Sequence, residues 1–415
     1  MSVTSITQPN PNRTLGFARE NGMLANTRTL PAATRIQSLE SLRGLMAIWV
    51  MLGHLLPTAG IRWGRWPGLL SELGEGIHAV NVFLILSGFV IFMLLDSARE
   101  RFSPFIVRRF FRLFPAYLVC LLAAIILLDI NSSAYQLIPW AHPVTEFMMR
   151  TTQEVHNHYF AHLAAHLSLL HGVVPQEWLP ESGYTFLAQG WSLSLEWQFY
   201  LIAPLIFALV SRRLVYFIPV LLVAYAAHRY LYGDNAFLPT SIYYFLVGIG
   251  SYYLWKYRNR IALPAFCWVL AVPAAAIATP LLTGSISLSI WAIVFTAMLS
   301  RASGTASPFE RAVHLLLEHK SAIYLGRISY SVYLSHTIVI TLVLAALVPY
   351  ARQFSQWSFL ALMGALVIPL TLAVSSVLYR YVEQPGIRTG KQIANRRRYA
   401  RRAKPENSRL LPERC

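Results

Sequence analysis

The sequence predicts an all-α polytopic integral membrane protein, a helical bundle with about ten transmembrane helices. Of the 415 residues, 56% are hydrophobic and only 13% are charged, and the apolar residues fall in long blocks. A soluble domain carries about 25% charged residues, and about 20 apolar residues in a row are enough to cross a bilayer. The composition therefore excludes a disordered chain, a coiled coil and most soluble enzymes.

The apolar blocks define the expected domain organisation. Their expected bounds are 41–58, 77–95, 113–130, 187–210, 214–232, 238–255, 262–280, 284–302, 322–349 and 357–380. The flanking sequence is polar and lacks helical periodicity at the N-terminus, which is typical of disorder. We therefore expect three parts: a disordered cytoplasmic tail over 1–38, a membrane domain over 39–385 and a basic cytoplasmic tail over 386–415.

Basic residues alternate between successive loops. Of the 35 Lys and Arg residues, 28 lie in the two tails and in every second loop, and eleven of these come after residue 379. Because basic loops remain on the cytoplasmic side, we expect both termini in the cytoplasm and the protein in the cytoplasmic (inner) membrane. The net charge of +17 is thus explained by topology and by contact with membrane lipids, and no nucleic-acid partner is expected.

Ionisable side chains inside apolar segments are costly, so each is a candidate for function. Arg43 and His54 are eleven residues apart in the first segment, which places them on one helical face about 16 Å apart along the axis. A neutral imidazole at this depth can act as a general base, although a packing hydrogen bond to a neighbouring helix would explain it equally well. His336, in a later segment, is a candidate for a second proton carrier.

Two further stretches are candidates for binding a ligand: one is basic and the other contains small residues. R-R-F-F-R contains Arg109 and Arg112 on one helical face, at the depth expected for Arg43. Guanidinium groups suit phosphate oxygens, which belong either to a ligand or to lipid headgroups. Ser87 and Gly88 leave room for either close helix packing or a slender ligand.

A third stretch, W-S-L-S-L-E, begins the fourth apolar segment and contains Trp191, Ser192 and Glu196. A carboxylate at this position either orients an imidazole, holds a proton or binds a sugar hydroxyl, or it forms a structural ion pair with an arginine. Near the end of the chain, S-Y-S-V-Y-L-S-H places Tyr330 close to His336.

Two groups are better explained by structure than by chemistry. His158, His162 and His166 have zinc-like spacing, but without a cysteine or carboxylate in register we favour a wet interfacial helix, and no metal site is expected. Glu383 is expected to pair with a basic neighbour such as Arg380.

Taken in order, these segments resemble the membrane acyltransferase family 3, of the O-antigen and exopolysaccharide acetylase type. The resemblance runs from about Ile36 to Pro385 and includes the spacing of Arg43 and His54, V-F-L-I-L-S-G-F-V, R-R-F-F-R, W-S-L-S-L-E, S-Y-S-V-Y-L-S-H and V-E-Q-P. It implies transfer of an acyl group, usually acetyl, from cytoplasmic acyl-coenzyme A to a carbohydrate hydroxyl. The acceptor would be a cell-surface polysaccharide or its lipid-linked precursor.

The resemblance also implies residue roles. His54 is the base, and Arg109 and Arg112 hold the phosphates of coenzyme A with support from Arg43. We further expect Glu196 to orient His54. The remaining assignments are Ser87 and Gly88 for cofactor binding, Ser192 for a less favoured acyl-enzyme route, and Trp191, Tyr330 and His336 for substrate binding. An alternative from another class is a transporter or flippase for a glycan or lipid intermediate, since buried charges also suit a transport path.

Overall fold

The computed structural model describes residues 32–62, 71–72, 74–98, 101–230, 236–260, 265–303 and 308–402. Within these ranges the chain forms helices and no strands. Residues 1–31 and 403–415, which belong to the two expected tails, lie outside the described residues. The predicted all-α fold is confirmed.

A helix overlaps each of the ten expected segments. These are α1 (Ala32–Leu55), α3 (Ile77–Ala98), α4 (Phe102–Ile126), α8 (Gly190–Arg212), α9 (Phe217–Tyr230), α10 (Leu238–Tyr257), α11 (Ala265–Thr283), α12 (Ile286–Ser303), α14 (Lys320–Leu347) and α15 (Gln356–Leu378). Among the described residues, six stretches are long and apolar enough to cross a membrane, namely Gln37–Ala59, Ile77–Ala98, Phe102–Ile126, Gly190–Arg212, Lys320–Gln353 and Gln356–Arg396. Shorter apolar stretches occur at Leu214–Ala227, Pro273–Thr283 and Ile286–Arg301. The protein is thus a polytopic membrane protein.

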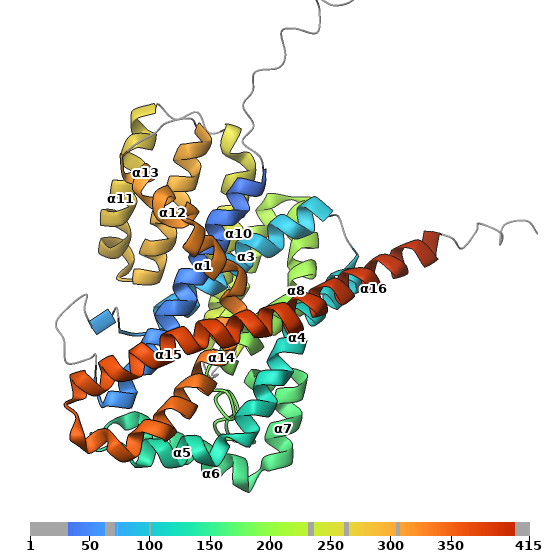
Figure 1. Cartoon of the computed structure of the whole chain (residues 1–415). Coiled ribbons are helices and arrows are strands. Elements are labelled where there is room, and N and C mark those ends of the chain that lie inside the picture. Colours follow the sequence, from blue (N-terminus) through green and yellow to red (C-terminus); the bar gives the residue numbers. More distant parts are fainter. Residues whose placement is uncertain are drawn as a thin grey trace, which may run out of the picture.

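Three shorter helices gather at one end of the bundle (Figure 1). They are α5 (Leu128–Gln136), α6 (Pro143–Asn157) and α7 (Tyr159–Ser168), and we call this end the α5–α7 end. His162 and His166 of α7 are completely buried, so the expectation of a wet interfacial helix is wrong for both. A further short helix, α13 (Pro308–Glu318), precedes α14.

Helices α1 and α14 lie side by side and run parallel. Gly44 of α1 meets Gly326 of α14, and His54 meets His336, so the two contacts share one register. A Cβ atom at either glycine would overlap the backbone of the other helix. Glycine at both positions therefore allows the close approach that brings the two histidines together.

Helices α3 and α10 also approach each other closely at glycines. Gly88 packs against the backbone of Phe245, and Gly248 packs against the backbone of Ile85. Among the two explanations considered for Gly88, this contact favours close helix packing.

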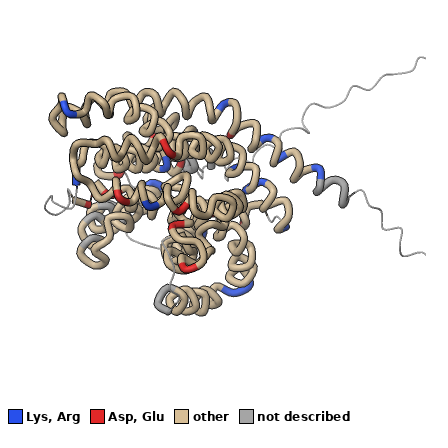
Figure 2. Tube along the Cα trace, turned by 90° about the horizontal axis from the view of Figure 1, so that it is seen from below, with Lys and Arg blue, Asp and Glu red and all other residues tan. Residues whose placement is uncertain are grey.

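The C-terminal part of the chain is helical further than expected. Helix α15 continues through a π-helical turn, Tyr379–Glu383, into α16 (Gln384–Arg402), whose glycines Gly386 and Gly390 pack on Phe111 of α4. Figure 2 shows Lys and Arg along α16 as it leaves the bundle. The expected boundary at residue 385 therefore falls inside a continuous helix.

Candidate active site

His54 and His336 form a pair in the interior of the bundle. Their ring centroids lie 5.0 Å apart, and Nε2 of His336 lies 3.3 Å from Nδ1 of His54. Nδ1 of His336 lies 3.1 Å from the Val332 carbonyl, and Nδ1 of His54 lies 3.0 Å from the Val50 carbonyl. Both histidines thus contact a carbonyl oxygen one turn earlier in their own helix.

These carbonyls assign the tautomers when both rings are neutral. A carbonyl oxygen only accepts hydrogen bonds, so each Nδ1 carries the proton. Nε2 of His336 then accepts from Nδ1–H of His54. The ring nitrogen of His54 with a free lone pair is Nε2, as a general base requires.

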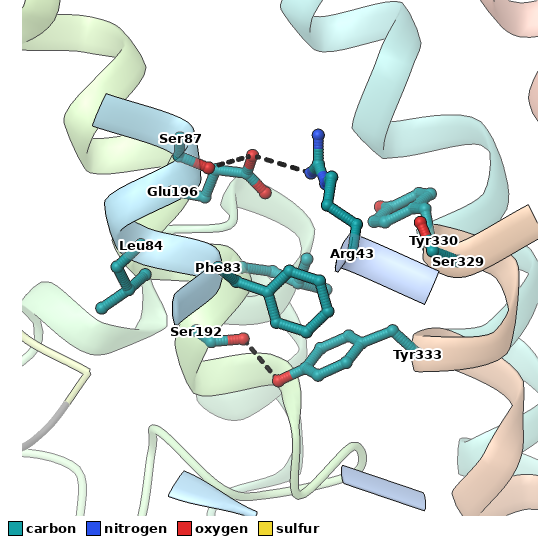
Figure 3. Close-up of a pocket in the computed structure, with 10 residues that line it drawn as sticks. Arg43, Phe83, Leu84, Ser87, Ser192, Glu196, Ser329, Tyr330 and Tyr333 are labelled. Carbon is teal, nitrogen blue, oxygen red and sulfur yellow. Dashed lines mark hydrogen bonds and ion pairs between the residues drawn. The ribbon is translucent and has the colours of Figure 1, made fainter. Parts of the chain in front are cut away.

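A pocket of about 420 Å³ lies on one side of this pair, between α1, α3, α8 and α14. Figure 3 shows its lining, which we call the arginine pocket: Arg43, Phe83, Leu84, Ser87, Ser192, Leu193, Glu196, Ser329, Tyr330 and Tyr333. Nη2 of Arg43 lies 3.8 Å from Oε1 of Glu196, and the Ser87 hydroxyl donates to the same oxygen at 3.1 Å. The Tyr200 hydroxyl also donates to Glu196.

Glu196 is therefore held by groups other than His54. Among the described residues, its partners are Arg43, Ser87 and Tyr200. The arrangement corresponds to the ion pair considered for this carboxylate. The group placed to orient His54 is instead His336.

A second ion pair lies beside the arginine pocket. Arg112 pairs with Glu383, whose side chain is completely buried, and lies over the ring of Tyr330. Glu383 also accepts from the Ser331 hydroxyl at 2.7 Å. The expected partner of Glu383, Arg380, is on the same helical segment, whereas the structure supplies an arginine from α4.

Arg109 differs from Arg112 in its surroundings. Its guanidinium lies 5.7 Å from the ring centre of Tyr200 and 5.9 Å from that of Phe105. Its Nε is buried and has no hydrogen-bond partner among the described residues. Since buried donors are almost always satisfied, Arg109 is the best placed of these arginines to receive a phosphate oxygen.

Ser192 and Tyr333 meet where the arginine pocket approaches the histidines. Their hydroxyl oxygens are 2.6 Å apart, and Ser192 also donates to the Gln189 carbonyl at 3.2 Å. The ring of Tyr333 is 6.0 Å from that of His336. No imidazole is among the hydrogen-bond partners of Ser192 in the described part of the chain, so its use as a nucleophile has no adjacent base there.

A second pocket, of about 660 Å³, lies on the other side of the histidine pair. We call it the threonine pocket, and its lining is His54, Ala124, Leu127, Leu128, Asn131, Tyr135, Met148, Thr151, Thr152, Tyr184, Phe186, Ala188, Thr337, Ile338, Ile340 and Thr341. Along α14 the arginine pocket contacts residues 329–333, and the threonine pocket contacts residues 337–341. His336 lies between these two stretches.

The structure thus divides the sequence-derived candidates into groups. Arg43, Ser87, Ser192, Glu196 and Tyr330 line the arginine pocket. His54 lines the threonine pocket beside His336. Trp191 is buried, and neither Trp191 nor Gly88 is among the lining residues of the two pockets.

Several residues of the site were not among the candidates chosen from the sequence. Tyr333 stands one turn before His336 in the same motif, and that spacing was a usable signal. Asn131 directly follows one apolar stretch and Thr341 lies inside another, and neither position by itself marks a functional residue. Tyr200 follows Glu196 by one helical turn, which predicts contact between them.

These features define a class: an integral membrane protein whose polar groups meet inside the bundle around a histidine pair. The chain belongs to a family of acyltransferases, because residues 36–380 match the family model described as an acyltransferase domain. Acyltransferase MdmB of Streptomyces mycarofaciens is similar, with 32% identity over 194 residues that cover 44% of this chain and 42% of the relative. The chain thus aligns with less than half the length of this relative. No solved structure was found to match.

Proposed function

We propose that this acyltransferase moves an acyl group, normally acetyl, from acyl-coenzyme A to a hydroxyl of a carbohydrate, with His54 as the general base. The observation that carries the proposal is the position of the histidine pair between two pockets, one of which has arginines at its margin. Family membership favours acyl transfer over the transporter alternative. The acceptor would be a cell-surface polysaccharide or its lipid-linked precursor, and the membrane would be the cytoplasmic (inner) one.

The arginine pocket suits acyl-coenzyme A. Nε of Arg109 is buried and has no hydrogen-bond partner among the described residues, and its guanidinium lies 5.7 Å from the ring centre of Tyr200, whose hydroxyl donates to Glu196 of the pocket lining. Arg43 pairs with Glu196 and Arg112 pairs with Glu383, so the nearby guanidinium of Arg109 adds an excess of positive charge for phosphate groups. The distance of about 16 Å between Arg43 and His54 along α1 matches an extended arm that joins phosphates to a thioester.

The residues of this chain perform the proton transfers. Acyl-coenzyme A supplies the thioester when bound. Nε2 of His54 takes the proton of the acceptor hydroxyl, whose oxygen forms a bond to the acyl carbon, and the bond between that carbon and sulfur breaks. His54 then returns the proton to the departing sulfur. His336 accepts from Nδ1–H of His54 throughout and so stabilises the imidazolium that forms between the two transfers.

The test uses purified His54→Ala protein and its parent. We expect His54→Ala to bind acetyl-CoA with unchanged affinity and to lose acetyl transfer by about 10²–10⁴-fold, measured with radiolabelled acetyl-CoA and native membranes as the source of acceptor. An Arg109→Gln variant is the complementary case and should lose acetyl-CoA binding. Transfer at the parent rate by His54→Ala would overturn the proposed base, and absence of acetyl-CoA binding by the parent would overturn the donor.

A further inference from the structure

The threonine pocket has a lining without formal charge. Its polar groups are hydroxyls, one amide and the His54 imidazole, and its lining contains no Lys, Arg, Asp or Glu. Burying a charged ligand without a partner of opposite charge is costly. The pocket is therefore unsuited to phosphates, nucleotides and carboxylates and suited to an uncharged compound that bears hydroxyl groups.

The pocket also contains polar atoms with spare hydrogen-bonding capacity. The Thr341 hydroxyl oxygen lies 2.8 Å from Oδ1 of Asn131 and 2.9 Å from the Thr337 carbonyl, so its single hydrogen is shared between two acceptors. Nδ2 of Asn131 lies 3.4 Å from the Met148 sulfur, and a thioether is a weak acceptor. The amide hydrogens of Asn131 thus remain available for a ligand oxygen.

One wall of the pocket is held in a strained conformation. Phe186 has a φ of 56°, at the centre of a tight turn closed by a 2.7 Å hydrogen bond from Leu187 N–H to the Thr185 carbonyl. Such backbone persists only where the surroundings enforce it, and it is common at ligand sites. Here the buried His162 and His166 both contact the Thr185 hydroxyl, at 3.2 and 2.9 Å.

The pocket is separate from the arginine pocket. The two linings share no residue, and their contacts on α14 are offset by about eight residues, or about 12 Å. The threonine pocket is built from the end of α4, from α5 and α6, and from the later half of α14, so it lies at the α5–α7 end. His54 lines this pocket and also contacts His336, so the pocket adjoins the histidine pair through His54.

We propose that the threonine pocket is the acceptor site, that it takes an uncharged sugar unit, and that this unit arrives from the membrane face opposite to the one that supplies acyl-coenzyme A. The sugar ring packs against Tyr184 and Phe186, and its hydroxyls bond to Asn131 and to the threonines. This inference rests on the proposed function, because it uses His54 as the base. It adds the location of the acceptor, its charge and its side of access.

The first experiment separates the acceptor site from the donor site. We expect Asn131→Leu and Thr341→Val to reduce transfer from radiolabelled acetyl-CoA to the acceptor in native membranes by roughly tenfold or more, while acetyl-CoA binding to the purified proteins stays at the parent value. Thr296→Val is the matched control, because among the described residues Thr296 bonds only to carbonyls of its own helix. Parent-level transfer by both variants, or loss of acetyl-CoA binding in both, overturns the assignment.

The second experiment tests the side of access. In a variant with Cys120, Cys267 and Cys415 replaced by serine, Thr152→Cys is treated with a membrane-impermeant thiosulfonate in vesicles of each orientation. We expect modification from the face opposite to the one from which Arg388→Cys on α16 reacts. Modification of both cysteines from one face, or no modification of Thr152→Cys from either face, overturns this part of the proposal.

The third experiment tests the class of acceptor. Methyl α-D-glucopyranoside and methyl α-D-glucopyranosiduronate, at equal concentrations, compete with the native acceptor for acetyl transfer. We expect inhibition by the neutral glycoside alone. Equal or stronger inhibition by the uronate, or inhibition by neither, overturns an uncharged sugar unit as the ligand. If the parent protein fails to bind acetyl-CoA at all, the failure lies with the proposed function and not with this pocket.

Discussion

At the scale of single residues, the site is decided by what each buried polar group contacts. His54 and His336 are 282 residues apart in the sequence and contact each other in the fold. Each ring also contacts a carbonyl one turn earlier in its own helix. Together these contacts determine which ring nitrogen carries the proton in each histidine while both rings are neutral. His336 thus acts through His54, and we regard it as a positioning residue.

Variants of His336 test this role. We expect His336→Leu to lower kcat for acetyl transfer by about 10–100-fold, because Nδ1–H of His54 loses its acceptor, while KM for acetyl-CoA stays near the parent value. His336→Gln keeps an oxygen near the position of Nε2 and should restore most of kcat. The limb of the pH–kcat profile that reports the base should be displaced in His336→Leu and return in His336→Gln. An unchanged profile in His336→Leu would show that the residue only packs.

Replacement of Glu383 should lower the stability of the folded protein. Its buried carboxylate holds Arg112 and Ser331, so Glu383→Ala leaves a buried arginine without its counter-charge. We expect a loss of about 3–5 kcal/mol in the free energy of unfolding, measured by thermal or denaturant unfolding in detergent. The double variant Glu383→Ala/Arg112→Met should lose less than Glu383→Ala. A double variant that is as unstable as the sum of the two single variants would contradict the direct pairing.

At the scale of helices, contact between α1 and α14 depends on two glycines. Gly326→Ala places a methyl group against the Glu40 carbonyl and forces the helices apart. We therefore expect loss of the folded protein or, in a folded fraction, loss of transfer through separation of His54 from His336. Gly250→Ala is the matched control, since its added Cβ would meet only a ring atom of Phe217 at 3.9 Å. Size-exclusion elution and transfer activity are the measurements, and parent-like behaviour of Gly326→Ala would contradict the close crossing.

The loop between α7 and α8 depends on neutral histidines. Burial lowers the pKa of His162 to about 4 and that of His171 to about 4, and burial also lowers the pKa of His166. In the unfolded chain these groups have a pKa near 6.5. Between about pH 6.5 and pH 4 the unfolded state therefore binds more protons than the folded state. The contribution of the neutral histidines to the stability of the folded state is complete above about pH 6.5 and is lost as the pH falls towards 4.

We therefore expect the melting temperature in detergent to fall by several degrees between pH 7 and pH 5. In His162→Gln, one of these titrating groups is gone, so the fall should be smaller. A surface variant, His156→Gln, leaves the buried cluster intact and serves as the control. An equal fall in His162→Gln and in the parent would contradict this explanation.

Sequence reasoning succeeded for the helices and failed for their partners. Long apolar stretches identify a membrane helix from local composition alone, which is why all ten segments contain one. Helix α16 was missed because it is polar, and it is stabilised by glycine contacts with α4 that no local pattern reveals. Arg112 and Glu383 are 271 residues apart, so their pairing follows only from tertiary packing.

At the scale of the whole molecule, the bundle places two different pockets on either side of the histidine pair. The arginine pocket and the threonine pocket can be occupied at the same time, because their linings share no residue. In the proposed reaction, donor and acceptor are therefore bound together at His54, and no covalent acyl-enzyme is needed. Ser192 agrees with this view, since its hydroxyl is engaged by Tyr333 at 2.6 Å.

The corresponding prediction concerns labelling of the protein itself. When the purified protein is incubated with radiolabelled acetyl-CoA without acceptor and then denatured, we expect no label on the polypeptide, because attack on the thioester awaits the acceptor hydroxyl. Ser192→Ala should retain transfer within about fivefold of the parent, which corresponds to the loss of about one hydrogen bond. The opposite result, stoichiometric label on the parent and none on Ser192→Ala, would establish an acyl-enzyme route. In that case the two pockets would be used in succession, and Tyr333 would have to move to free the serine.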